Sequence, residues 1–204
     1  MLDVGSARNL GWWRVSSDCV GGGRDLLELI EVLGDDLRSG SPVALGLECP
    51  LWIPRARSTA DLGRARPVDG GRSWSAGAGP IVLAYGLQEI VFIIDELLLR
   101  VPAVVATTHL GSWQRDEAQL LLWEAFVSGR GKDREAAEPH ISDARAAAVE
   151  FASRRSTDSL RRDQSIPSSV SIAALALFTT QVATAGDVLG TTPLVVRVDE
   201  STPS

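Results

Sequence analysis

The sequence predicts an α/β protein with three layers, in which helices cover both faces of a central mixed sheet. Short apolar runs of β-forming residues alternate with longer segments whose apolar residues recur at helical spacing, as is typical of this fold class. An N-terminal hairpin precedes the alternation, so the sheet should contain both antiparallel and parallel strand pairs. The length of 204 residues, with 45% hydrophobic and 23% charged residues, indicates a single globular domain over residues 1–204.

The N-terminal part of the chain predicts a hairpin, a helix and a strand. Residues 1–4 and 12–15 are apolar or bulky, and the turn-forming residues between them can close a hairpin. After the glycines at 21–23, apolar residues at helical spacing predict a helix of about fifteen residues. Residues 42–47 form a short apolar run that predicts the next strand, which ends at Glu48.

The rest of the chain predicts a long loop followed by helices and strands. Residues 51–79 are rich in Arg, Gly, Ser and Pro without a sustained period, which predicts an Arg-rich insertion loop. Residues 80–100 predict a helix that is apolar around most of its circumference and is therefore packed on more than one side. We further predict a strand at 119–127, a helix at 139–155 and a closing strand at 194–198. Residues 168–184 could form a helix or a strand, and their alanine content favours a helix.

Composition excludes several classes of protein. The net charge of −6 excludes a polycation that coats nucleic acid, although a local basic patch is compatible with it. Two cysteines, Cys19 and Cys49, are too few for a disulfide framework or a four-thiolate zinc site. The N-terminal residues contain no apolar signal-peptide core, and the longest charge-free stretch, 164–186, is too polar to span a bilayer. We therefore expect a cytoplasmic protein with no membrane partner. The composition is compatible with a homodimer.

Three acidic residues interrupt apolar elements. Asp3 lies within the first strand, Glu48 ends a later strand, and Asp143 lies on a predicted helix three residues after His140. A carboxylate at a strand end costs free energy unless it is solvated, paired or bound to metal. If the three converge, their oxygens form a site for Mg²⁺ or Mn²⁺. Singly, Asp3 could cap a turn, Glu48 could pair with an arginine, and Asp143 could support a helix N-terminus.

The order of these motifs resembles that of a known superfamily. A first-strand Asp is followed by a hairpin ending in Gly11-Trp12, then by Glu48-Cys-Pro-Leu51, Trp123-Glu124-Ala-Phe126 and His140-Ile-Ser-Asp143-Ala144. The last motif resembles the metal-binding motif of RuvC-type Holliday-junction resolvases. The whole pattern, over roughly residues 1 to 150, resembles the predicted nucleases of the ribonuclease-H-like superfamily.

This resemblance implies a ribonuclease-H-like sheet and a divalent-metal-dependent nuclease acting on DNA or RNA. It implies that Asp3, Glu48 and Asp143 are the metal ligands, with His140 and Glu124 as auxiliary catalytic residues. Two-metal hydrolysis of a phosphodiester uses such carboxylates to hold the cations that activate water and stabilise the leaving oxygen. Glu48 departs from the group, in which Asp is often found at this position, but it remains a carboxylate.

The insertion loop predicts a contact with nucleic acid. Arginines bind phosphates and aromatic rings stack on bases, and this loop contains both. The predicted nucleic-acid-binding residues are Trp52, Arg55, Arg57, Arg64, Arg66 and Arg72. The alternative is a solvated loop whose arginines pair with acids elsewhere, with Trp52 filling the core.

Two other functions compete with the nuclease. A non-catalytic nucleic-acid-binding or scaffold protein could have the same fold with a degenerate site. The turn Asp3-Val-Gly-Ser6 also resembles the phosphate-binding hairpin of sugar kinases and actin-like ATPases. Those phosphotransferases clamp the nucleotide between two such domains, whereas this chain is long enough for one, so this alternative is the weakest.

Overall fold

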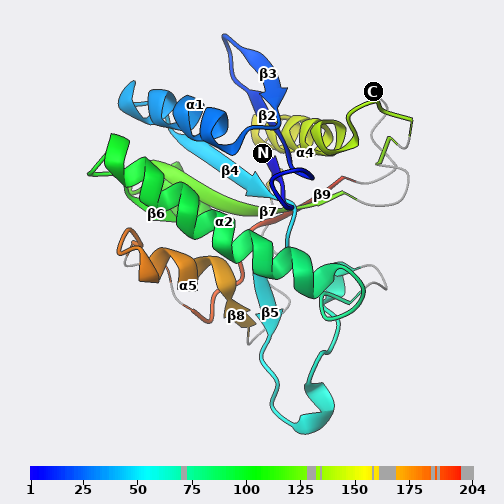
Figure 1. Cartoon of the computed structure of the whole chain (residues 1–204). Coiled ribbons are helices and arrows are strands. Elements are labelled where there is room, and N and C mark those ends of the chain that lie inside the picture. Colours follow the sequence, from blue (N-terminus) through cyan, green and yellow to red (C-terminus); the bar gives the residue numbers. More distant parts are fainter. Residues whose placement is uncertain are drawn as a thin grey trace.

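In the computed structural model, helices pack on both faces of a seven-stranded mixed sheet, and a two-stranded sheet is separate from it (Figure 1). The structure describes residues 1–69, 73–127, 132–133, 135–157, 159–160, 169–184, 187 and 189–198, and all counts refer to these. The strands are β1 (Leu2–Asp3), β2 (Gly11–Val15), β3 (Val20–Gly23), β4 (Val43–Leu47), β5 (Trp52–Pro54), β6 (Ala106–Thr107), β7 (Leu120–Val127), β8 (Ser169–Ser171) and β9 (Val195–Val198). The helices are α1 (Leu26–Arg38), α2 (Gly79–Arg100), α3 (Leu110–Gln114), α4 (Pro139–Ser156) and α5 (Ile172–Thr179), with 3₁₀ turns at Thr59–Asp61 and Pro67–Asp69. The predicted three-layer α/β fold with a central mixed sheet is confirmed.

The strand order brings the ends of two parallel strands together. β3, β2 and β1 form an antiparallel meander, and β1 then pairs in parallel with β4. β4 pairs in parallel with β7, whose other edge pairs with β6 and, farther along, with β9. Leu2 lies opposite Leu47, and Leu47 lies opposite Glu124. The residue that ends β1 and the residue that follows β4 therefore lie side by side, at the carboxyl ends of these two parallel strands.

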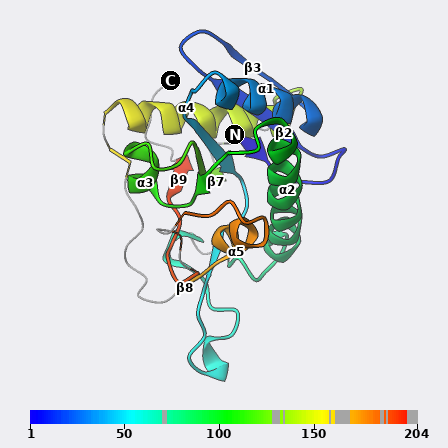
Figure 2. The ribbon, with the colours of Figure 1, turned by 90° about the vertical axis from the view of Figure 1, so that its left-hand side faces the viewer.

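Each face of the sheet has its own hydrophobic core. Figure 2 shows α2 and α3 on opposite sides of β7. On one face, Ile30 of α1 and Ile94 of α2 pack with Leu45 of β4, and α5 extends this layer. On the other face, Phe151 of α4 stacks on Trp123 of β7 with ring centroids 4.5 Å apart, and α3 lies beside them. Burying one such side chain stabilises the fold by about 1.5–3 kcal/mol, so these contacts fix the helices on the sheet.

The structure corrects two predicted segments. The predicted helix at 168–184 is divided into β8, which pairs with β5, and α5. The Ser171 hydroxyl accepts a hydrogen bond from the Ala174 amide at 3.1 Å and so begins α5 later than predicted. The predicted loop at 51–79 is partly structured, because it contains β5 and both 3₁₀ turns. The sequence analysis also missed β3, β6 and α3, which are too short or too glycine-rich to give a periodic signal.

No helix in the described part of the chain is both long and apolar enough to cross a membrane.

Candidate metal centre

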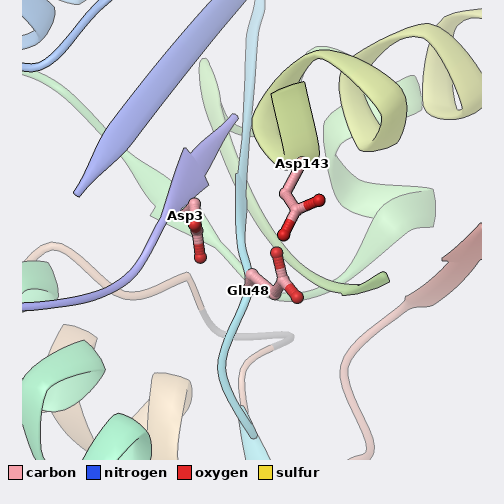
Figure 3. Close-up of side chains that lie close together, drawn as sticks. All are labelled: Asp3, Glu48 and Asp143. Atoms are coloured by element: carbon pink, nitrogen blue, oxygen red, sulfur yellow. The ribbon is translucent and has the colours of Figure 1, made fainter. Parts of the chain in front are cut away.

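Three carboxylates from distant parts of the sequence converge where β1 and β4 end (Figure 3). Asp3 ends β1, Glu48 follows β4 directly, and Asp143 lies near the start of α4. Each offers one oxygen, and these three atoms all lie within 4.8 Å of one another. The structure thus brings together the three residues that the sequence predicts as ligands. We call them the acid cluster; their oxygens could hold a metal ion.

The backbone positions the acid cluster from two sides. Parallel pairing of β1 with β4 joins the Glu48 amide to the Leu2 carbonyl at 2.9 Å, which sets Glu48 beside Asp3. α4 approaches the hairpin at Gly11, where a β-carbon would come within 2.5 Å of the His140 carbonyl carbon. Only glycine permits this approach. The glycine that begins β2 therefore has a structural role in bringing α4 to the site.

Burial and mutual repulsion destabilise the charged forms of the acid cluster. Burial, with a further contribution from Asp143, raises the pKa of Asp3 to about 7, although the charge of Lys132 opposes the shift. Burial, followed by the Asp3 charge, raises the pKa of Glu48 to about 8. The Glu48 Oε2 atom is buried and has no hydrogen-bond partner among the described residues. A bound cation would give that oxygen a partner and favour the ionised carboxylates.

Lys132 belongs to the candidate site, and the sequence analysis did not predict it there. Its Nζ donates to Glu48 Oε1 at 3.2 Å and to Asp143 Oδ2 at 2.5 Å, so the ammonium bridges two of the three carboxylates. Burial lowers the pKa of Lys132, but the charges of Glu48 and Asp143 outweigh burial and raise it overall. The sequence contained a signal, because Lys132 is the only lysine among 20 basic residues. A chain that uses arginine everywhere else keeps a compact ammonium at this position.

His140 lies beside the acid cluster, as the sequence predicts. Its Nδ1 is 2.6 Å from Asp3 Oδ2, and its side chain is 38% exposed. A histidine in this position orients the carboxylate and leaves its second ring nitrogen free to face solvent or substrate.

Glu124 does not join the acid cluster, so its prediction as an auxiliary catalytic residue is wrong. Its Oε1 and Oε2 accept hydrogen bonds from the Arg66 guanidinium at 2.7 and 2.8 Å, and Oε2 also accepts from the Leu51 amide. Arg66 further donates to Asp69 Oδ1 at 2.8 Å. We call Arg66, Asp69 and Glu124 the Arg66 cluster. All three side chains are about 1% exposed, so this cluster is structural.

Two predicted nucleic-acid contacts are also corrected. Arg66 cannot reach a phosphate backbone, because its buried guanidinium already donates to Glu124, to Asp69 and, at 3.1 Å, to the Trp52 carbonyl. Trp52 is fully buried, and the central carbon of the Arg66 guanidinium lies 4.9 Å from the centroid of its ring. Trp52 therefore fills the core and cannot stack on a base. Arg55, Arg57 and Arg64 are exposed on the segment that projects beyond β5 (Figure 1). Arg72 lies outside the described residues.

Comparison of the chain with protein-family models, with curated proteins and with solved structures finds no match. The acid cluster offers only carboxylate oxygens, and these three oxygens could hold a metal ion.

Proposed function

We propose that this protein is a divalent-metal-dependent nuclease that hydrolyses phosphodiester bonds of DNA or RNA. The observation that carries the proposal is the convergence of Asp3, Glu48 and Asp143 within 4.8 Å, with more negative charge than the neighbouring lysine balances. Such an excess of buried carboxylate is costly to the fold, and a functional site that binds cations accounts for it.

The resemblance to the ribonuclease-H-like superfamily supports a nuclease over other hydrolases. Its metal-ligand motifs fall at the end of β1, after β4 and at the start of α4, which are the elements that meet at the acid cluster. The glycine of Gly11-Trp12 lies where β2 meets α4. The motifs are thus connected in space as well as ordered in sequence.

In this mechanism Asp3, Glu48 and Asp143 would hold Mg²⁺ or Mn²⁺. When bound, such cations activate water and stabilise the leaving oxygen of a phosphodiester. His140 fixes the orientation of Asp3 through Nδ1. Lys132 bridges Glu48 and Asp143 through its ammonium and so holds these two carboxylates together.

The exposed arginines supply the proposed contact with the nucleic-acid backbone. Arg55, Arg57 and Arg64 lie on the projecting segment, and the chain runs from Glu48 directly through β5 into it. The Arg66 cluster anchors the base of this segment in the core. A basic segment with a fixed base can guide a strand toward the acid cluster in a protein whose net charge is −6.

The test is cleavage of single-stranded, duplex, RNA–DNA hybrid and branched substrates with Mg²⁺ and with Mn²⁺. We expect Asp3→Asn and Glu48→Gln to reduce cleavage by more than about 100-fold, since even residues that only orient metal ligands contribute about 10- to 100-fold. Asp95→Asn removes an exposed carboxylate of α2 far along the sequence from these motifs and serves as the matched control. Equal loss in all three variants would contradict a specific role for the acid cluster.

One observation favours the alternative, a non-catalytic nucleic-acid-binding or scaffold protein. Lys132 already neutralises part of the charge on Glu48 and Asp143 without a cation. If no substrate is cut at high enzyme concentration with Mn²⁺, while nucleic acid still binds, the nuclease proposal fails and this alternative replaces it.

A further inference from the structure

A cavity of about 610 Å³ lies between α2 and the turn that follows Asp3. Its volume falls within the range of about 300–1,000 Å³ that is typical of ligand sites. Its walls include Gly5, Ser6 and Leu10 from the hairpin, and Tyr85, Glu89 and Phe92 from α2. Gly5 is only two residues along the chain from Asp3, and the Asp3 charge contributes to the raised pKa of Glu89 in this cavity.

Glu89 is the unusual residue in this cavity. It is 7% exposed, and its Oε1 accepts a hydrogen bond from the Gly5 amide at 3.3 Å. Its Oε2 is buried without a hydrogen-bond partner among the described residues. A buried carboxylate oxygen without a partner is costly, and the cost is recovered if a ligand donates a hydrogen bond to it.

Two aromatic side chains flank this carboxylate. Tyr85, Glu89 and Phe92 are four and three residues apart, so they share one face of α2. Tyr85 is 38% exposed and Phe92 is 42% exposed, so both present ring surface to the cavity or its mouth. An acceptor between aromatic rings suits a planar ligand that has donors on its edge.

The other charged groups of the lining are already engaged. Arg24 donates to Glu138 at 3.1 Å and to the Arg8 carbonyl at 2.5 Å. Asp25 accepts from the Leu27 amide and caps α1. Among the charged residues of this lining, Glu89 is therefore the one with a carboxylate oxygen that accepts no hydrogen bond from the described residues.

We infer that this cavity binds a nucleobase with an exocyclic amino group, which donates to Glu89 while its ring contacts Tyr85 and Phe92. The inference rests on the proposed function, because it assigns to this cavity a base of the nucleic acid bound at the acid cluster. Carboxylates accept hydrogen bonds from amino groups such as that of cytosine, and aromatic side chains stack on any base. Uracil and thymine lack the amino group, and their N3–H donor lies between two carbonyl oxygens that the carboxylate would repel.

The test is calorimetric titration with cytidine, adenosine, guanosine and uridine in EDTA, at a pH above the Glu89 pKa of about 7. We expect the three amino-bearing nucleosides to bind at least about tenfold more tightly than uridine. Glu89→Gln should remove this difference, since an amide donates as well as accepts. Tyr85→Ala changes a partly exposed residue and should weaken binding of all four nucleosides.

Glu96→Gln is the matched control, because Glu96 lies on the same helix but pairs with Arg100 at 2.8 Å outside the cavity lining. It should leave the preference unchanged. Equal affinity for cytidine and uridine, or no saturable binding of any nucleoside at millimolar concentration, would overturn the inference. Nucleosides contain no phosphodiester and EDTA removes metal, so this result is independent of whether the protein cleaves nucleic acid.

Discussion

Two clusters of buried charge lie at neighbouring strands of one sheet, and they differ in how their charge is balanced. In the Arg66 cluster, a guanidinium bonds both oxygens of Glu124 and one oxygen of Asp69. In the acid cluster, three carboxylates share one lysine, and Glu48 Oε2 has no partner among the described residues. Burial of charge is common to both, so burial alone does not identify the functional site. The acid cluster is the candidate functional site because it has more carboxylates than its one lysine balances.

The basic residues of the two clusters, Arg66 and Lys132, also differ in how they bind their carboxylates. Arg66 is planar and reaches two carboxylates and a carbonyl at once, which suits a permanent structural link. Lys132 is 39% exposed and holds its carboxylates through a single, more weakly anchored ammonium.

The largest effect is expected from breaking the Arg66 cluster. Arg66→Met should lower the free energy of unfolding by about 3–5 kcal/mol, because it leaves two buried carboxylates without their cation. Arg64→Met changes an exposed arginine of the same segment and should alter stability by less than about 0.5 kcal/mol. Urea denaturation of both variants measures this difference. A stable Arg66→Met protein would mean that the cluster is not a structural link.

The next effect is stabilisation of the acid cluster by metal. A cation that binds only the native state should add about 2.7 kcal/mol at a hundredfold excess over its Kd, so Mn²⁺ should raise the melting temperature. Asp143→Asn should relieve repulsion in EDTA and weaken or abolish the Mn²⁺ shift. Asp69→Asn in the Arg66 cluster should destabilise the protein and leave the shift intact. If wild type shows no shift at millimolar Mn²⁺, the metal centre loses its main physical support.

The next effect is that of pH in the absence of metal. The raised pKa values, about 7 for Asp3 and about 8 for Glu48, mean that the folded state keeps protons that the unfolded state releases. The free energy of unfolding should therefore decrease as pH rises from about 5 to about 8. Glu48→Gln should flatten this dependence, because it removes one of the two raised carboxylates and the repulsion between that carboxylate and Asp3. An identical pH dependence in EDTA would contradict the raised pKa of Glu48.

Much of the fold and of the acid cluster could be predicted from the sequence. The strand at 43–47 and the helices at 79–100 and 139–156 follow from strong apolar patterns, and the structure places them close to the predicted bounds. Asp3, Glu48 and Asp143 stood out because each interrupts such a pattern. A charged residue inside an apolar run is a local signal, and it is visible without knowledge of the fold.

What could not be predicted depends on contacts between distant residues. Arg66 looks like the other arginines of its segment, and only the register of β7 shows that Glu124 lies within its reach. Lys132 is eleven residues from Asp143 and 84 from Glu48, so no spacing rule connects them. The sequence shows that Lys132 is the single lysine of the chain, but this count does not predict which residues its side chain contacts.

The last prediction separates Arg66 from the exposed arginines of its own segment. Replacing Arg55, Arg57 and Arg64 by alanine should weaken nucleic-acid binding and flatten its salt dependence, because each lost phosphate contact removes about 0.7 to 0.9 from the slope of log K against log salt. The melting temperature should hardly change, since the three side chains are exposed while the Arg66 cluster that anchors the segment remains. Fluorescence anisotropy with a labelled oligonucleotide over a salt series measures the slope. An unchanged slope would mean that the segment is a solvated surface, and that a strand reaches the acid cluster by another route.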